Sequence, residues 1–321
     1  MKINLKNEMA KDRAGFHVDM MAFDPKDSFG ANVGNNPGDQ TIAPGQSKTY
    51  TYYAHPEYGE LAALVQDWGN VVENPRNGLF GSIIVGPKGS RYRDPVTGDD
   101  ITMKSSWRAD VLVDRTITGN DTRKNYRDFS LMFHDEDNIV GVSFMPYIQQ
   151  VAGISAVNYR SEPTAWRIEK GCDLFQVFSC VKAGEEPVTP VIQAHLGDPV
   201  AIHVLGAFSE QVQLFSVDGH EWPHEPYMQG ADQVSTVEFG GSEIINAYLT
   251  GGAGGPNKIV GDYMWKNQRP GFTNAGQWGL FKVLPLGDQH ILSLGSQSPA
   301  GKTAERETAG GSLVRTSMGG R

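Results

Sequence analysis

Short strand-like segments, each bounded by Gly or Pro turn signals, recur along this chain of 321 residues. They run through residues 41–55 (TIAPGQSKTYTYYAH), 77–89 (NGLFGSIIVGPKG) and 189–206 (TPVIQAHLGDPVAIHVLG). Alternation of apolar and polar residues, or a short apolar run between turns, is the pattern of a β-strand. The chain has 38 Gly and 18 Pro to supply the turns and no long helical periodicity. We therefore expect an all-β protein, long enough for two domains.

Shifts in composition divide the chain into four parts. Residues 1–90 form a first domain that, on this interpretation, lacks its N-terminal edge strand. Residues 91–125 are polar and rich in turn residues, as an interdomain connection is. Residues 126–286 carry the successive strand patterns of a second domain. Residues 287–321 are rich in Gly, Ser, Thr and Ala, which predicts a flexible tail or an arm that orders against a partner.

The overall charge and hydropathy exclude two classes of partner. A formal net charge of −9 argues against nucleic acid, because the electrostatic part of such binding requires clustered Lys and Arg. No run approaches the roughly 20 apolar residues of a membrane-spanning helix. The first residues, MKINLKNEMAKDRAG, lack the apolar core of a signal peptide. The residues alone thus leave the compartment unknown, and small molecules and other proteins remain as ligands.

The two cysteines, Cys172 and Cys180, lie in the segment GCDLFQVFSC. They can form a disulfide if this segment doubles back, but not if it is one extended strand. Buried free thiols and a disulfide are therefore both open.

An acidic motif runs from His134 to Asp137. Its oxygen donors suit Ca²⁺ or Mn²⁺, yet it lacks the spaced loop of a calcium site. We expect it to end a strand at a solvated edge.

Several longer phrases of the sequence point to one family. They are residues 34–54, 78–98, 209–226 (SEQVQLFSVDGHEWPHEP), 261–265 (GDYMW) and 276–283 (GQWGLFKV). In this order they resemble bacterial multicopper oxidases, particularly the manganese-oxidase-like branch, over residues 1–285. The resemblance implies two cupredoxin-like domains, each a Greek-key β-sandwich. It says less about activity, because function lies in the site rather than in the fold.

In the first domain, the resemblance implies that half of the family's copper-cluster histidines remain. The family's HxHG segment matches His17 to Met20, so that Asp19 replaces the second histidine. The following HxH segment matches Tyr53 to His55 and retains His55. Two imidazoles and a carboxylate can hold Cu(II), Zn or Fe. His17, Asp19 and His55 are thus a candidate metal site, with a pair of leftover, hydrogen-bonded histidines as the alternative.

In the last domain, the resemblance implies that the copper ligands are replaced. The family's HxxHxHGH segment falls on Gln213, Ser216, Asp218 and His220, so that its type 1 histidine and both cluster histidines are replaced, while His220 is retained at a position that is not normally a copper ligand. Its HCHxxxH segment, which carries the type 1 cysteine between two cluster histidines, falls on the region of Trp265, Lys266 and Asn267, and its axial methionine falls on Gln277. A type 1 site needs a thiolate with two imidazoles and a weak axial ligand. Neither cysteine of this chain lies in the matching segment. The type 1 and trinuclear copper sites of the family are therefore predicted to be lost.

His220 and His224 are four residues apart in GHEWPHEP. On a helix this spacing would favour a zinc site, but Pro223 argues against a helix here. A metal site in a loop or at an interface is one interpretation. Packing of this segment under the sandwich is the other.

Two functions compete. The first is a non-catalytic structural, assembly or binding subunit with degenerate copper sites and no expected cofactor. The second is a copper-dependent oxidoreductase, acting on metal ions or phenols, with an unconventional site or one completed between subunits. Both are compatible with a homo-oligomer, such as a trimer, or with a larger assembly. An extracytoplasmic location, periplasmic or secreted, is implied by the resemblance alone.

Overall fold

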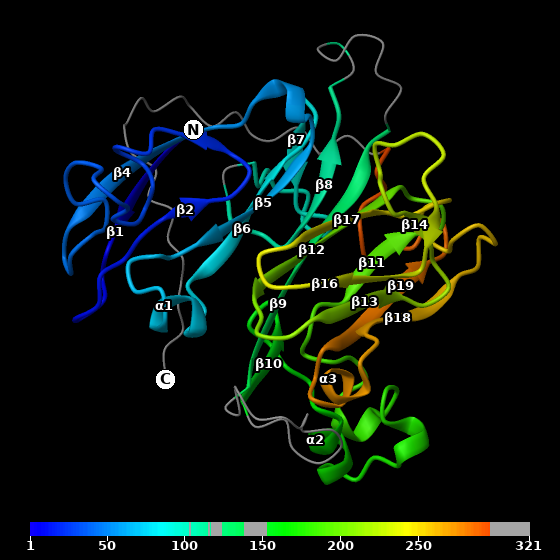
Figure 1. Ribbon diagram of the computed structural model, residues 1–321. Coiled ribbons are helices and arrows are strands. Elements are labelled where there is room, and N and C mark those ends of the chain that lie inside the picture. The colour runs from blue at the N-terminus through cyan, green and yellow to red at the C-terminus, as the bar shows by residue number, and fades with distance from the viewer. Residues whose placement is uncertain (103, 115, 117–123, 138–152, 296–321) are drawn as a thin grey trace. The chain divides into compact units, whose positions relative to one another are not determined.

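The computed structural model describes residues 1–321 except 103, 115, 117–123, 138–152 and 296–321 (Figure 1). The described chain consists mostly of strands with a few short helices, which confirms the predicted all-β class. Within this part of the chain, no helix has both the length and the apolarity that crossing a bilayer takes. Two compact units are present, one containing Met1–Arg123 and the other Lys124–Leu294.

The first unit contains two three-stranded sheets. The first has the order β1 (Lys2–Lys6), β4 (Ser47–Tyr53), β3 (Ala22–Phe23), and the second β2 (His17–Val18), β5 (Leu61–Gln66), β6 (Phe80–Val85). All these pairings are antiparallel. Tyr50 and Tyr52 alternate onto one face of β4, are fully buried, and donate their hydroxyls to the carbonyls of Gln40 and Ser28. Two short helices, η1 (Pro56–Tyr58) and α1 (Glu73–Arg76), lie in the connections.

The stretch predicted as an interdomain connection contains paired strands. These are β7 (Arg91–Arg93) and β8 (Arg108–Leu112), which run antiparallel. Arg93 and Asp110 face each other across the pair, with Nε and Oδ2 2.9 Å apart, and both side chains are buried. This charge-assisted hydrogen bond joins the two strands through side chains that are shielded from solvent.

The second unit is built from two facing sheets. In one, β12 (Val200–Phe208) lies between β9 (Tyr126–Asp137) and β17 (Ile244–Tyr248), and β10 (Gly153–Val157) pairs with β9. The other has the order β11 (Ile192–His195), β19 (Trp278–Leu284), β18 (Gly261–Asn267), β13 (Gln213–Val217), β16 (Thr236–Phe239). β12 runs parallel to β9, and β11 parallel to β19; the other pairings are antiparallel. A small ribbon pairs β14 (Trp222–Pro223) with β15 (Gln233–Val234).

An aromatic core joins these two sheets. Phe129, Leu131 and Phe133 alternate onto one buried face of β9. The ring of Phe133 meets rings from three strands of the facing sheet edge-on, those of Phe215, Phe239 and Trp265, at centroid distances of 6.1, 5.2 and 6.2 Å. Edge-to-face packing of this kind adds stability beyond the burial of area.

Between β10 and β11, residues 161–187 leave the sandwich as a small helical excursion, here called the disulfide lobe (Figure 1). It contains α2 (Thr164–Glu169), η2 (Leu174–Gln176) and η3 (Val181–Ala183). The lobe doubles back on itself, and Cys172 and Cys180 form a disulfide. Of the two alternatives that the sequence left open, buried free thiols or a disulfide, the structure has the disulfide.

The end of the second unit lies beyond residue 286. Ile291 and Leu294 are buried, and the carbonyls of Leu292 and Leu294 accept hydrogen bonds from Arg127 and Asn125. The remainder of the predicted tail, residues 296–321, lies outside the described residues.

Candidate functional site

Three amide side chains meet in the interior of the second unit. Asn267, the last residue of β18, donates from Nδ2 to Oε1 of Gln213 and to Oε1 of Gln277, the latter at 2.7 Å. All three residues are fully buried. They are the residues that the resemblance aligned with the type 1 copper segments, so the fold does bring these positions together.

Strand pairing and a short helix explain how these side chains come together. β13 and β18 pair with Phe215 opposite Asn267, which brings the start of β13 to the end of β18. After β18 the chain turns through α3 (Pro270–Asn274), and the N–H of Asn267 donates to the carbonyl of Gln277, directly before β19. This backbone hydrogen bond closes the loop that contains α3 and brings the side chains of Asn267 and Gln277 together.

A buried carboxyl group extends this network. Oδ1 of Asp135 accepts from Nε2 of Gln213 at 2.5 Å and from the hydroxyl of Ser209. Oδ2 of Asp135 is buried without a hydrogen-bond partner, as is the hydroxyl of Ser155, the residue opposite it on β10. Asp135, Gln213, Asn267 and Gln277 are together called the amide–carboxyl network below.

Burial changes the titration of this carboxyl group. It raises the pKa of Asp135 from 3.8 to about 7, although the hydrogen bonds from Ser209 and the backbone of Glu210 oppose the shift. Glu210 raises the pKa by like charge, and Arg269 lowers it. The expectation that residues 134–137 end a strand at a solvated edge is thus wrong for His134, Asp135 and Glu136, which are buried. β9 pairs with β10 at all three residues and with β12 at His134.

An ion pair lies across β13 and β18 next to the network. Nζ of Lys266 is 2.6 Å from both carboxylate oxygens of Asp218. Lys266 stands opposite Ser216 in the strand register. The resemblance aligned Asp218 with a cluster histidine and Lys266 with the cysteine-bearing segment, so a salt bridge joins two of the replaced positions.

His220 is a buried, fully hydrogen-bonded histidine. Nδ1 donates to the carbonyl of Asp218 at 3.0 Å, and Nε2 accepts from the N–H of Gly254 at 3.0 Å. Burial lowers its pKa below 6.5, which favours the neutral ring that these two bonds require. The ring packs against those of Tyr263 and Phe281. His220 thus ties a glycine-rich loop to the sandwich.

His224 lies in a different environment from His220. Its side chain is 53% exposed, and Nδ1 is 3.6 Å from the carboxylate of Glu225. Because both ring nitrogens of His220 are already bonded, the two histidines do not present a shared pair of free ligand atoms.

His17 and Asp19 do approach each other in the first unit. Nε2 of His17 is 3.3 Å from Oδ1 of Asp19, while Nδ1 donates to the carbonyl of Phe29 at 2.8 Å. Burial lowers the pKa of His17, but Asp19 and the Phe29 carbonyl together raise it above 6.5. The rings of Phe23, Phe29 and Trp68 surround the imidazole.

His55 has a local structural role at the start of η1. Its Nδ1 accepts from the N–H of Glu57 at 3.3 Å, which caps this short helix, and the side chain is 44% exposed. Over the described parts of both units, no three His, Cys, Asp or Glu side chains are grouped so that they could hold a metal ion.

Sequence reasoning overlooked a buried histidine–carboxylate pair in the second unit. Nε2 of His203 is 3.4 Å from Oδ1 of Asp128, and Nδ1 lies 2.6 Å from Oδ1 of Asn246. Burial lowers the pKa of His203, but Asp128 and Asn246 raise it above 6.5. The alternation of residues on β9 and β12 could have indicated this contact, because the parallel register brings these strands together.

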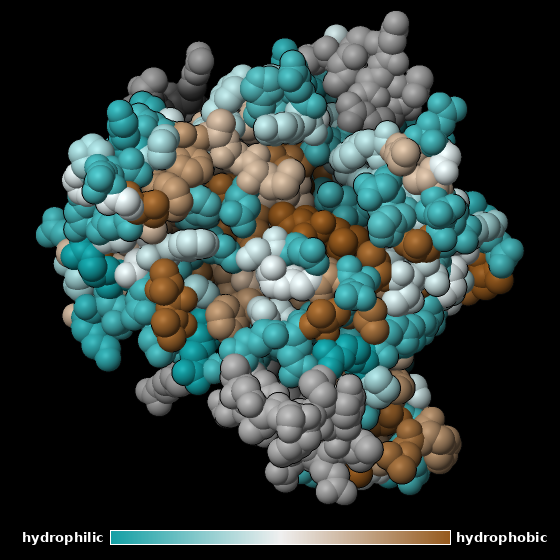
Figure 2. All heavy atoms as spheres, viewed as in Figure 1, coloured by the Kyte–Doolittle hydropathy of each residue, from teal (hydrophilic) through white to brown (hydrophobic). Residues whose placement is uncertain are grey.

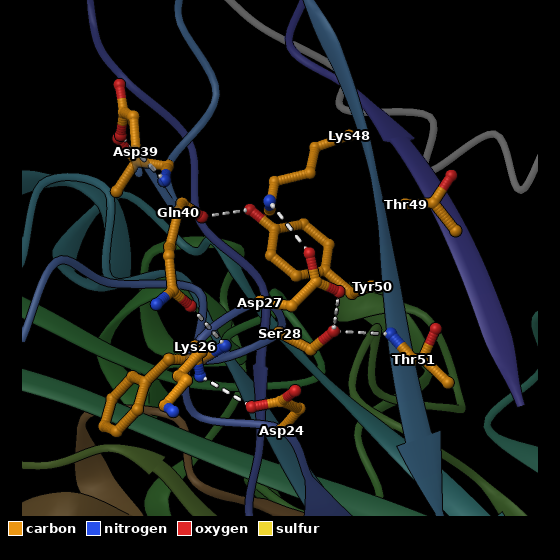
Figure 3. A network of polar contacts seen from close by, with 12 residues as sticks. Asp24, Lys26, Asp27, Ser28, Asp39, Gln40, Lys48, Thr49, Tyr50 and Thr51 are labelled. Carbon is orange, nitrogen blue, oxygen red and sulfur yellow. Dashed lines mark hydrogen bonds and ion pairs between the residues drawn. The ribbon is translucent and has the colours of Figure 1, made fainter. Parts of the chain in front are cut away.

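The first unit also has a shallow cavity of about 300 Å³, lined by Ala22, Phe23, Asp24, Asp27, Ser28, Thr51, Tyr52 and Tyr53. Figure 3 shows the polar groups beside it. Ser28 accepts from the N–H of Thr51 and donates to Asp27, which also faces Lys48 at 3.7 Å. Asp24 accepts from the N–H of Lys26. The polar groups thus bind one another, which marks the network as part of the fold.

Comparison with known proteins identifies the fold. No protein-family model and no curated protein matches the sequence. A copper nitrite reductase from Nitrosomonas europaea matches with a TM-score of 0.55 and 14% identity, over 90% of this chain and 81% of that one. The multicopper oxidase mgLAC matches with a TM-score of 0.52 and 14% identity, over 89% and 74%. The chain therefore has the predicted cupredoxin-like fold of multicopper oxidases.

Proposed function

We propose that this protein is a non-catalytic member of the cupredoxin-fold proteins, in which polar protein groups replace the type 1 copper. It would act as a structural, assembly or binding subunit. The observation that carries this proposal is the amide–carboxyl network, in which Asn267 bonds Gln213 and Gln277 at the positions aligned with copper ligands.

The donor chemistry of the network does not fit a type 1 copper. Such a site requires a thiolate and imidazole nitrogens, which are soft or borderline ligands. Amide side chains offer only hard carbonyl oxygens, and the oxygens of Gln213 and Gln277 already accept from Asn267. A metal here would also leave the amide nitrogen of Asn267 buried without a partner, at a cost of about 1–3 kcal/mol.

An ion pair between two replaced positions also argues against copper. The ammonium of Lys266, in the segment aligned with the type 1 cysteine, is held by Asp218, which aligns with a cluster histidine. A fixed positive charge repels a copper ion, and Ser216 beside it offers a hydroxyl in place of an imidazole. On this proposal, the described residues of the second unit lack the ligands for a type 1 copper and for a cluster that would receive its electron.

The alternative of a copper oxidoreductase has one observation in its favour. The bond from Nδ1 of His17 to the Phe29 carbonyl fixes the tautomer and leaves Nε2 beside Asp19. Second-sphere hydrogen bonds of this kind orient metal-binding histidines. We keep His17, Asp19 and His55 as the candidate metal residues of this alternative.

Copper loading separates the two functions. The chain is loaded with Cu(II), dialysed, and analysed for metal content and visible absorption. We expect less than about a tenth of a copper per chain and no blue colour, because no thiolate is available as a ligand. His17→Ala/His55→Ala should then change nothing. A copper content near one that this variant loses, and that the control His224→Ala keeps, would favour the alternative, and copper-dependent oxidation of Mn(II) or a phenol by the loaded chain would then establish an oxidoreductase.

We also propose an oxidising, extracytoplasmic compartment. The disulfide between Cys172 and Cys180 supports it, because disulfides persist where thiols are not kept reduced. Thiol titration of the protein isolated from its own cells tests this proposal, and two free thiols per chain would contradict it. Sedimentation velocity decides whether the chain forms a homo-oligomer, such as a trimer, or remains monomeric.

A further inference from the structure

The cavity of the first unit lies where the chain after β3 folds back against β4. The carbonyl of Asp24 accepts from the N–H groups of Asp27 and Ser28, which closes a tight turn. The hydroxyl oxygen of Ser28 accepts from the N–H of Thr51 on β4 at 2.9 Å (Figure 3). Because these bonds form within the chain, the cavity walls are fixed before a ligand arrives, which lowers the entropy lost on binding.

Three polar groups that line the cavity keep free hydrogen-bonding capacity. Oδ1 of Asp24 accepts from the N–H of Lys26 at 2.9 Å, and Oδ2 has no partner among the described residues. The exposed hydroxyls of Thr51 and Tyr53 also make no hydrogen bond within the part of the chain that the structure describes. The cavity therefore offers one acceptor and two groups that both donate and accept.

The charges beside the cavity are of both signs. Asp24 and Asp27 supply two carboxylates. Lys26 lies between them in the turn, and Nζ of Lys48 is 3.7 Å from Oδ1 of Asp27. Two ammonium groups thus balance two carboxylates, which favours a neutral ligand over an anion or a cation. An apolar ligand is disfavoured too, because it would cover the free carboxylate oxygen and hydroxyls without bonding them.

Exposed aromatic rings continue from the cavity along the surface. The ring of His55 lies 5.8 Å from that of Tyr53 and 5.8 Å from that of Tyr58. Tyr53 and Tyr58 are 54% and 58% exposed. These three residues are called the aromatic patch below. In Figure 2, hydrophilic side chains cover much of the first unit, on the left of the view, and apolar ones lie scattered among them. The patch thus supplies ring faces within a polar surface.

We infer that the cavity and the aromatic patch together bind a neutral saccharide chain. The hydroxyls of a sugar both donate and accept, which matches the free polar groups of the cavity, and its C–H face can cover an aromatic ring. A volume of about 300 Å³ is at the lower end for ligand pockets and suits one sugar ring, with the next ring over the patch. The inference goes beyond the proposed function, because it involves no residue of the amide–carboxyl network and copper loading does not test it.

Titration calorimetry on the intact protein tests this site. The probes are three neutral hexasaccharides, cellohexaose, mannohexaose and chitohexaose. We expect at least one to bind, and Tyr53→Ala to weaken this binding roughly tenfold, because the ring covers one face of the ligand. Tyr58→Ala, outside the sheet, should weaken it as well. The matched control is Phe175→Ala, an exposed ring in the second unit, which should bind as the unchanged protein does.

Asp24→Asn separates a saccharide from a cation. The amide keeps an acceptor for the N–H of Lys26 and places an N–H₂ group where Oδ2 was. A sugar hydroxyl can accept from this donor, so the affinity for the hexasaccharide should be nearly unchanged, whereas an ammonium ligand would lose its charge partner.

Three results would overturn the inference. They are no binding of any of the three hexasaccharides, equal binding by Tyr53→Ala and Phe175→Ala, and binding of spermidine in place of the saccharides that Asp24→Asn abolishes. Sedimentation of the protein with the insoluble polymer of the bound sugar distinguishes the two sources of this chemistry. Co-sedimentation that Tyr53→Ala loses identifies a polysaccharide surface, and binding of the hexasaccharide alone identifies a free oligosaccharide.

Discussion

The carboxyl group of Asp135 makes a sharp prediction about stability and pH. Asp135→Asn keeps the size of the side chain and an Oδ1 that can accept from Ser209 and Gln213. It removes the negative charge that the unchanged protein must bury at alkaline pH, where Oδ2 has no partner. It also places an N–H₂ group at that unpartnered position.

The sign and size of the effect follow from the pKa. Burial raises the pKa of Asp135 from 3.8 to about 7, so the folded protein holds a proton that the unfolded chain has released. The free energy of unfolding therefore falls as pH rises between these two values. The shift corresponds to roughly 4 kcal/mol at ~1.4 kcal/mol per pKa unit. Below pH 3.8 this penalty is absent, because both states are protonated.

The variant lacks this titration. Near pH 4 the protonated carboxyl of the unchanged protein places an O–H at the same unpartnered position as the N–H₂ of the variant, so the two proteins should differ in stability by less than about 1 kcal/mol. Near pH 8 we expect Asp135→Asn to be roughly 4 kcal/mol more stable, because the unchanged protein then buries a charge. Urea denaturation followed by tryptophan fluorescence at several pH values measures both curves. Other titrating groups, such as His203, are common to both proteins and cancel in the difference. Parallel curves, with a difference that does not change with pH, would refute the assignment of a raised pKa to Asp135.

Three further predictions concern buried groups of the second unit. Arg167→Met should lower the free energy of unfolding by about 3–5 kcal/mol, because Glu162 is left as a buried unpaired carboxylate. The double variant Arg167→Met/Glu162→Gln should recover part of this lost stability, which thermal denaturation measures. Asp128 keeps the pKa of His203 above 6.5, so their pairing stabilises the fold below pH 6.5 and this contribution is lost as pH rises through the folded-state pKa. His203→Gln should remove that pH dependence, which NMR titration of the ring and denaturation curves check together. Gly279→Ala should cost about 1–3 kcal/mol, because the added Cβ would lie 2.3 Å from a core tryptophan ring; an unchanged melting temperature would contradict this.

The sequence predicted the fold class. Short strand patterns with Gly and Pro turns between them indicated an all-β protein, and the resemblance to multicopper oxidases implied the β-sandwich. The order of motifs also aligned Gln213, Asn267 and Gln277 with one family site, although they are far apart in the chain. Local pattern carries this information because side-chain period and turn chemistry are properties of neighbouring residues.

Only the tertiary structure decided the environment of individual polar groups. The acidic residues 134–137 are typical of a solvated segment, yet Asp135 is buried: it pairs with Ser155 of β10, and its carboxyl group bonds Ser209 and Gln213 from distant parts of the chain. The two cysteines form a bond because an excursion held by Arg167 folds back on itself. The burial, pKa and hydrogen bonds of a side chain depend on which distant strands cover it, and no local pattern contains that information.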